Sequence, residues 1–137
     1  MSLLLSALSL LVLVGGPAPD WQRAWVAEAF ICAACSPEDR QWLTARLGQT
    51  VLLAPDRFLN PFYEDCASGA DYSDLMPRSR AEALRHFRGV TVGTERPITG
   101  LVRCATASGP PNVVARLLIE GDRALLLHES GAVLQLR

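Results

Sequence analysis

Residues 113–136, VVARLLIEGDRALLLHESGAVLQL, consist of three apolar runs separated by two short turns. In the first run, apolar residues recur at every second position, which is the period of a β-strand with one buried face. Gly121-Asp122 and Ser130-Gly131 are residue pairs typical of hairpin turns. The segment therefore predicts the last strands of an antiparallel β-meander.

Two apolar runs nearer the N-terminus also predict strands. Alternate positions from Ile98 to Cys104 share one face, and this run extends the meander by one strand. Residues 50–54 form a short buried run that ends at the turn Pro55-Asp56.

Two segments carry the signals of helix N-termini. Ser36 is suited to cap a helix whose first position is Pro37, and Gly48 is suited to end that helix. Ser79 begins a second helix, with a capping box completed by Glu82. We therefore expect an α+β fold in which two short helices pack on a small antiparallel β-sheet or partial barrel with a C-terminal β-meander.

Apolar residues elsewhere predict further helix faces. Asp20 is suited to cap a helix over residues 21–31, a segment that is apolar on most sides. In the helix after Ser36, Trp42 and Leu43 belong to an apolar stripe that we expect to face the core.

The chain begins with an apolar run, residues 3–14, which is typical of the core of a secretory signal peptide and too short for an ordinary membrane span. We expect a leader over residues 1–18, with Ala-Glu-Ala at 27–29 as a later cleavage site, and a single disulfide-stabilised domain over residues 30–137. A retained N-terminal anchor is the alternative. The protein is therefore predicted to be exported, to the periplasm or by secretion.

Export makes the four cysteines, Cys32, Cys35, Cys66 and Cys104, disulfide candidates. Cys32 and Cys35 form a CxxC motif just before a helix, which also suits a thiol–disulfide redox site. The pairing stays open: Cys66 and Cys104 are joined either to each other or each to a different member of the CxxC motif. A zinc site would need a second closely spaced pair of cysteines. A covalent haem site would need a histidine at position 36, which is Ser36. We therefore predict no metal and no cofactor.

The charge pattern excludes some partners. The 137 residues are 50% hydrophobic and carry a net charge of −1, which gives no electrostatic basis for binding nucleic acid. Membrane contact is expected only through an uncleaved leader. An acidic loop between residues 60 and 77 precedes a group of arginines that either hold the loop in place or bind an anion, and a solvated surface is the simplest interpretation of both. The acidic residues are Glu64, Asp65, Asp71 and Asp74, and the arginines are Arg78, Arg80, Arg85 and Arg88.

No residue pattern points to catalysis. The two histidines, His86 and His128, lie outside any hydrolase or metalloprotease motif. Tyr63 and Tyr72 fall in the expected loop, where exposed aromatic side chains are typical of protein contact surfaces. We therefore predict no catalytic residue and place Tyr63 and Tyr72 among the candidate partner contacts.

The C-terminal tail contains four short segments in meander order: VRC at 102–104, ARL at 115–117, ALLL at 124–127 and ESGA at 129–132. These segments resemble the C-terminal meander of the periplasmic inhibitors of c-type lysozyme. Members of that family have a small antiparallel barrel and a Ser-Gly-Ala loop that enters the lysozyme cleft. The resemblance, which covers about the last quarter of the chain, implies that Ser130 and Gly131 are partner contacts.

These features predict a small, exported, non-enzymatic protein of the bacterial periplasm or cell envelope. Its expected role is that of a binding or inhibitor module whose partner is a protein such as a secreted enzyme. One alternative is an exported redox protein that uses Cys32 and Cys35. The other is a structural envelope protein held by its N-terminal anchor.

Overall fold

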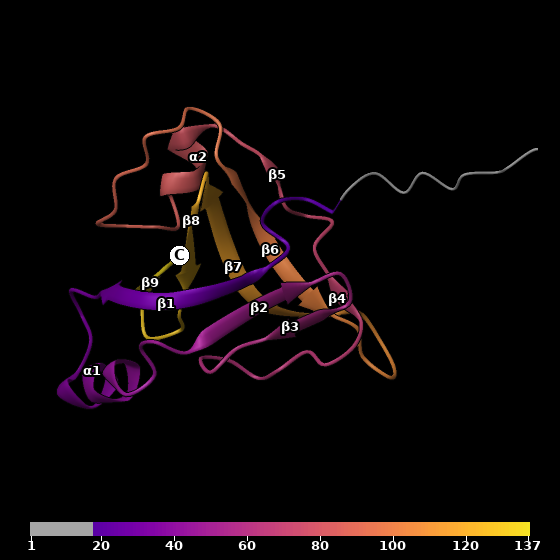
Figure 1. Cartoon of the computed structure of the whole chain (residues 1–137), viewed down its shortest axis with the longest axis horizontal. Helices are drawn as coiled ribbons and strands as arrows, with labels where there is room; N and C mark the ends of the chain where they lie inside the picture. Colours follow the sequence, from indigo (N-terminus) through magenta and orange to yellow (C-terminus); the bar gives the residue numbers. More distant parts are fainter. Residues whose placement is uncertain (1–17) are drawn as a thin grey trace, which may run out of the picture.

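The computed structural model of the protein describes residues 18–137, so nearly all of the expected leader lies outside the described residues. Strands form most of the regular structure and the helices are short (Figure 1). In chain order the elements are β1 (Ala24–Ile31), α1 (Pro37–Thr44), β2 (Thr50–Ala54), β3 (Arg57–Leu59), β4 (Ala70–Asp71), β5 (Met76–Pro77), α2 (Arg80–Leu84), β6 (Ile98–Cys104), β7 (Asn112–Glu120), β8 (Arg123–Leu127) and β9 (Val133–Leu136).

The strands form one antiparallel sheet in the order β3-β2-β1-β9-β8-β7-β6-β4, and β5 also pairs with β6. The sheet nearly closes into a barrel. Phe58 of β3 forms an isolated antiparallel bridge with Cys66, and Cys66 is disulfide-bonded to Cys104 at the end of β6. The expected α+β class is therefore confirmed in its coarse form, with a barrel-like sheet dominating two short helices.

The predicted C-terminal meander is confirmed. Strands β6, β7, β8 and β9 follow one another as antiparallel neighbours. Leu117 pairs with Leu126, and Leu126 pairs with Leu134, and all three side chains are fully buried. The period-of-two pattern thus places one apolar row inside the barrel, as a half-buried strand requires.

The expected helix over residues 21–31 is wrong, because most of this segment forms strand β1. Trp25 and Ala27 are buried, whereas Val26 between them is 43% exposed, which is the alternation of a strand. β1 pairs with β2 on one side and with β9 on the other. This pairing with remote segments outweighs the local capping signal of Asp20, and the folded unit includes all of β1.

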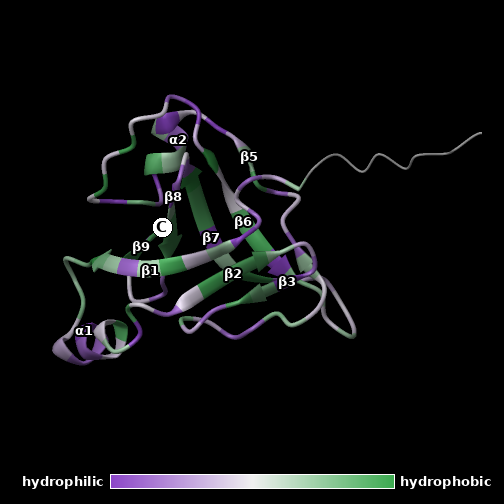
Figure 2. Cartoon of the chain, viewed as in Figure 1, coloured by the Kyte–Doolittle hydropathy of each residue, from purple (hydrophilic) through white to green (hydrophobic). Residues whose placement is uncertain are grey.

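The apolar residues form two clusters on opposite faces of the meander. The larger cluster fills the barrel and draws on β1, β2, β3 and the inner rows of β6 to β9. The smaller cluster lies on the outer face, where α2 and the following loop cover it. Figure 2 shows β7 and β8 as mainly hydrophobic, as expected of strands that are covered on both faces. The outer cluster comprises Ala83, Phe87, Val92, Leu118, Leu125 and Val133.

Both helix starts lie where the sequence predicts them. The Ser36 hydroxyl accepts a hydrogen bond from the Asp39 N–H, and the Asp39 carboxylate accepts one from the Ser36 N–H. The Ser79 hydroxyl likewise accepts from the Glu82 N–H, but the Glu82 carboxylate lies near Arg78, so the predicted capping box at Ser79 is only half formed. Helix α1 ends at Thr44, one turn before the expected glycine, because the chain continues in turns that lead into β2.

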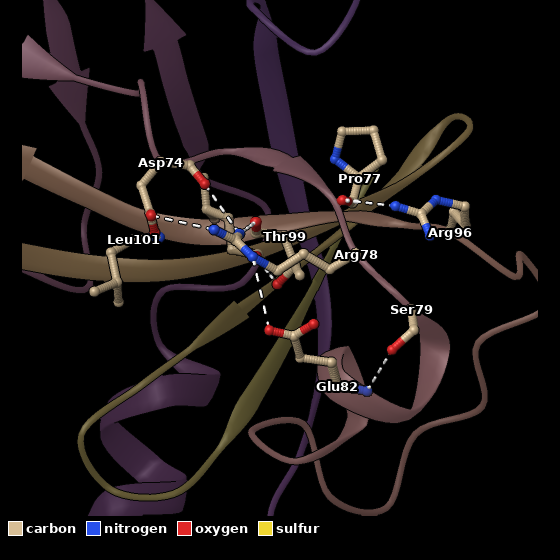
Figure 3. A network of polar contacts seen from close by, with 9 residues as sticks. Asp74, Pro77, Arg78, Ser79, Glu82, Arg96, Thr99 and Leu101 are labelled. Carbon is tan, nitrogen blue, oxygen red and sulfur yellow. Dashed lines mark hydrogen bonds and ion pairs between the residues drawn. The ribbon is translucent and has the colours of Figure 1, made fainter.

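Arg78 holds the acidic loop in place, as one of the two expected roles of the arginines. Its guanidinium donates to the carboxylate of Asp74 at 3.2 Å and to the backbone carbonyl of Thr99 in β6. The other carboxylate oxygen of Asp74 accepts a hydrogen bond of 2.7 Å from the Leu101 N–H (Figure 3). The Glu82 carboxylate lies 3.9 Å from Arg78, so the network joins the loop, α2 and β6.

Candidate functional site

The four cysteines form two disulfides, Cys32–Cys35 and Cys66–Cys104. This is one of the two pairings that the sequence leaves open, and no free cysteine remains. A zinc site built from these four thiolates is therefore excluded. The part of the chain that the structure describes holds no group of three or more His, Cys, Asp or Glu residues arranged around a metal position.

The two disulfides differ in what they contribute to stability. Cys66 is 1% exposed, and its bridge spans a sequence separation of 38, whereas the Cys32–Cys35 bridge spans only 3. The chain-entropy model gives about 4 kcal/mol for the long loop and about 2 kcal/mol for the short one. The Cys66–Cys104 bridge is therefore the main covalent support of the barrel. The Cys32–Cys35 bridge contributes less to stability, which leaves room for a functional role at its own position.

That short disulfide lies beside a cluster of polar and aromatic side chains around His128, at the end of β8. The Ser130 hydroxyl is 2.7 Å from His128 Nδ1, and Cys35 Sγ is 3.7 Å from the Ser130 Oγ. The ring centroids of Trp42 and Tyr63 lie 5.2 Å and 5.5 Å from that of the histidine. We call these five residues the His128 cluster. They come from four separate segments of the chain.

The hydrogen bonds of His128 define its neutral form. Nδ1 accepts from the Ser130 N–H at 3.2 Å as well as from the hydroxyl, so this nitrogen carries no proton. Burial lowers the pKa of His128 below its ordinary value, although the neighbouring Glu129 carboxylate acts in the opposite direction. His128 therefore acts as a neutral structural acceptor near pH 7.

Residues 129–131 form a three-residue hairpin loop between β8 and β9. The Gly131 N–H donates to the carbonyl of His128 at 2.9 Å, and the His128 N–H donates to the carbonyl of Ala132 at 2.8 Å. Gly131 has φ +89°, the conformation that the third residue of such a loop adopts. The side chain of Ser130 turns back toward His128, while Glu129 is exposed. The predicted Ser130-Gly131 turn is thus confirmed.

Tyr63 is held by a second loop. The Asn60 side-chain carbonyl accepts from the N–H groups of Phe62 and Tyr63 at 2.8 Å and 2.7 Å. Arg46, from the turn after α1, donates to the carbonyl of Pro61 at 3.1 Å and stacks 3.6 Å over the ring of Trp42. These contacts dock the loop against α1 and bring Tyr63 to the 129–131 loop.

Burial raises the pKa of Tyr63 above its ordinary value, and the Glu129 carboxylate adds to this effect. The phenol therefore stays protonated and keeps its ability to donate. Its hydroxyl is buried and has no hydrogen-bond partner among the described residues.

Two hollows lie on either side of His128 and Glu129. The larger, of about 610 Å³, runs along β7 and is bounded by the loop of Tyr63 and Glu64. The smaller hollow, of about 410 Å³, lies against α1 and is lined by Trp42 and Phe62. His128 and Glu129 line both hollows and form the boundary between them.

The structure brings together three of the four predicted contact residues. Ser130, Gly131 and Tyr63 lie around His128. Tyr72 instead is 8% exposed, packs 5.3 Å from the ring of Trp21 and donates its hydroxyl hydrogen to the carbonyl of Arg57. Tyr72 is therefore a core residue with little surface to offer a partner.

The sequence did not single out two members of the site. Trp42 was expected to face the core with Leu43, but Leu43 is fully buried and Trp42 is 37% exposed beside His128. His128 was placed at a strand end beside a turn, which is confirmed. Its contact with Ser130 depends on the three-residue loop. The only sign of this contact in the sequence is that the two residues are two positions apart.

No family model, curated protein or solved structure matches the chain. No relative's activity therefore bears on the choice between binding and catalysis. Between residues 18 and 137, no helix has the length and apolar character needed to cross a membrane.

Proposed function

We propose that the protein is an exported, non-enzymatic binding module of the inhibitor type, and that its partner is a secreted enzyme. The contact surface consists of the 129–131 loop and Tyr63. The observation that carries the proposal is the position of Glu129 in this loop, because Glu129 is exposed and, with His128, lines both hollows at their boundary. A ridge between two hollows is suited to insert into a cleft of the partner, while the walls of that cleft pack into the hollows.

The rigidity of the loop supports binding. Ser130 Oγ accepts from the Ala132 N–H at 3.3 Å and contacts His128 Nδ1, so the side chain closes the turn from within. The backbone bonds between His128 and Gly131 hold the same turn from outside. A loop that is already ordered loses less conformational entropy when a partner binds it, and so gains affinity.

The same hydrogen bonds argue against a role of Ser130 and His128 as the nucleophile and base of a hydrolase. A serine nucleophile needs a base that is itself oriented by a third group, usually a carboxylate. Within residues 18–137, the His128 side chain hydrogen-bonds only to Ser130, and to no carboxylate. The serine hydroxyl is engaged inside the turn, which supports a structural role for the pair.

Two disulfides are typical of exported proteins, because reducing compartments keep cysteines as thiols. The periplasm or cell envelope of a bacterium is the proposed location. Cleavage of the leader is proposed before Asp20, since cleavage after residue 29 would remove the buried Trp25 and Ala27 from the centre of the sheet. Peptide mass spectrometry of the mature N-terminus tests this point and also separates a cleaved leader from a retained anchor.

The first partner to assay is a c-type lysozyme, because of the resemblance of the C-terminal tail to the periplasmic inhibitors of that enzyme. The assay is lysis of bacterial cell walls by purified lysozyme in the presence of the full mature chain. Glu129→Lys reverses the exposed charge at the ridge. Glu95→Lys makes the same change at an exposed site outside both hollows.

The proposal expects the wild type and Glu95→Lys to inhibit lysis, and Glu129→Lys to lose at least about tenfold in potency, the scale of one interfacial charge contact. Absence of inhibition by the wild type at large molar excess would reject lysozyme as the partner. Equal potency of the two variants would reject the 129–131 loop as the contact surface.

A thiol–disulfide role is the second candidate, and one observation favours it. Cys35 is only partly buried, and its sulfur lies against the Ser130–His128 pair. In such a reaction an external thiolate attacks one sulfur of the bridge, forms a mixed disulfide and releases the other cysteine as a thiolate, and a second thiol of the donor completes the exchange. The double variant Cys32→Ser/Cys35→Ser separates the two roles: partner binding survives under the first proposal, and reductase activity disappears under the second.

A further inference from the structure

Strand β7 has an edge that no other strand covers. β7 pairs with β6 over nearly its whole length, from Asn112 to Ile119, but its pairing with β8 begins only at Arg116. β8 ends at Leu127, opposite Arg116, and the chain then turns back into β9. Among the described residues, 112–115 therefore have no strand partner on the β8 side of the sheet.

This edge lies in the larger hollow. All four residues of the edge line the groove of about 610 Å³, together with Tyr63 and Glu64 on the other wall. Four residues of extended chain span roughly 13 Å, at about 3.3 Å per residue. An uncovered strand edge presents backbone N–H and C=O groups that can pair with another extended chain. The groove thus gives such a chain both space and backbone partners.

Strand β7 carries a bulge at this edge. The register against β6 shifts between Val102 and Arg103, so β7 carries one extra residue, Val114, between Val113 and Ala115. A bulge of this kind bends and twists a strand, and bulges are concentrated at sheet edges and beside functional sites. Val113 is 56% exposed, which leaves its apolar side chain available to a neighbour on the added strand.

The groove also has a defined chemistry. The exposed carboxylates of Glu64 and Glu129 lie on its walls, and Arg116 is the only arginine or lysine that lines it. Apolar surface comes from Leu127 and from the valines of β7. The buried Tyr63 hydroxyl, on the same wall as Glu64, lacks a partner, and an unpaired buried donor is costly unless a ligand satisfies it.

We infer that the groove takes an extended segment of a protein partner, in which basic and apolar residues alternate, as an added strand against residues 112–115. Backbone hydrogen bonds to β7 supply much of the affinity, and alternate side chains of the segment supply the specificity. The apolar side chains of the segment pack on Leu127 and the β7 valines, and the basic ones face Glu64 and Glu129. This inference rests on the proposed binding function and identifies how the partner is held.

The probes are three labelled hexapeptides with blocked ends. The first alternates valine and lysine, the second alternates valine and glutamate, and the third has the valine–lysine sequence with alternate backbone nitrogens methylated. Fluorescence anisotropy with the full mature chain measures affinity. Amide hydrogen exchange, followed residue by residue by NMR, reports which backbone groups become protected.

We expect the valine–lysine peptide to bind and to slow amide exchange within residues 112–115. The glutamate peptide and the methylated peptide each bind at least about tenfold more weakly, because they lose charge complementarity and backbone donors respectively. Glu129→Lys weakens binding of the lysine peptide by a similar factor, and Glu95→Lys does not. No binding at millimolar peptide, equal affinity for the methylated peptide, or unchanged exchange at residues 112–115 would overturn the inference.

The failure of this inference is distinguishable from failure of the proposed function. If inhibition of lysozyme depends on Glu129 while complex formation leaves the exchange of residues 112–115 unchanged, the binding role stands and strand addition is wrong. If the Glu129→Lys variant inhibits as well as the wild type, the proposed contact surface itself is wrong.

Discussion

The substitution Gly100→Ala tests the close contact between β6 and the acidic loop. A Cβ at this position would overlap the backbone oxygen of Asp74 and would lie 2.8 Å from its carboxylate Oδ2. Since Cβ atoms essentially never approach another heavy atom within 3.0 Å, the backbone of Asp74 has to move. The loop that Arg78 fastens to β6 is then displaced.

The magnitude follows from the bonds that this movement breaks. The Asp74 carboxylate accepts from the Leu101 N–H at 2.7 Å and pairs with Arg78 at 3.2 Å. Loss of one charge-assisted hydrogen bond costs about 1.5–3 kcal/mol. Overpacking adds about 1–3 kcal/mol. We therefore expect Gly100→Ala to lower the free energy of unfolding by roughly 3–5 kcal/mol, a large part of the total for a small domain.

Urea denaturation followed by tryptophan fluorescence and far-UV circular dichroism measures this loss. Gly93→Ala is the matched control, because a Cβ at Gly93 meets nothing within 4 Å. Its expected effect is within about 1 kcal/mol of zero, the range in which reduced chain entropy offsets small strains. If Gly100→Ala is as stable as Gly93→Ala, the close contact between β6 and the loop is not as described.

Two further predictions concern the disulfides and the buried histidine. Removal of the long bridge in Cys66→Ser/Cys104→Ser lowers the free energy of unfolding by about 4 kcal/mol, and removal of the short bridge in Cys32→Ser/Cys35→Ser lowers it by about 2 kcal/mol, both measured in urea; equal losses would contradict the assignment of the long bridge as the main support. The folded-state pKa of His128 lies below the unfolded value of about 6.5, so its stabilising contribution is present above that value and is lost as the pH falls toward the folded pKa. The wild type therefore loses more stability than His128→Gln between pH 7 and pH 5, and an NMR titration that places the folded pKa of His128 above 6.5 would refute this.

The parts of the fold that the sequence predicts are those with local causes. The period-of-two apolar pattern and the glycine turns specify β7, β8 and β9 without reference to the rest of the chain. Ser36 and Ser79 cap helices through bonds to residues three positions later, so their roles are also visible locally. β3, β4 and β5 have two or three residues each and leave no periodic signal.

The remaining features depend on contacts between distant segments. β1 is a strand because β2 and β9 pair with it, although its composition and the preceding aspartate favour a helix. The His128 cluster joins segments around residues 35, 42, 63 and 128–130. The sequence pointed to two of these segments as contact surfaces, to 128–130 through the resemblance of the tail and to 63 through an aromatic residue in an expected loop. The open edge of β7 exists because β8 is shorter than β7, a relation between two hairpins that no local pattern reports.

The most direct test of the binding role is to titrate a c-type lysozyme with the wild type, Glu129→Lys and Glu95→Lys chains and to measure residual lysis of cell walls. The account predicts inhibition by the wild type and Glu95→Lys, and a loss of at least about tenfold in potency for Glu129→Lys. Equal inhibition by all three chains would contradict the assignment of the ridge at Glu129 as the surface that meets the partner, and no inhibition by any of them would contradict the choice of enzyme.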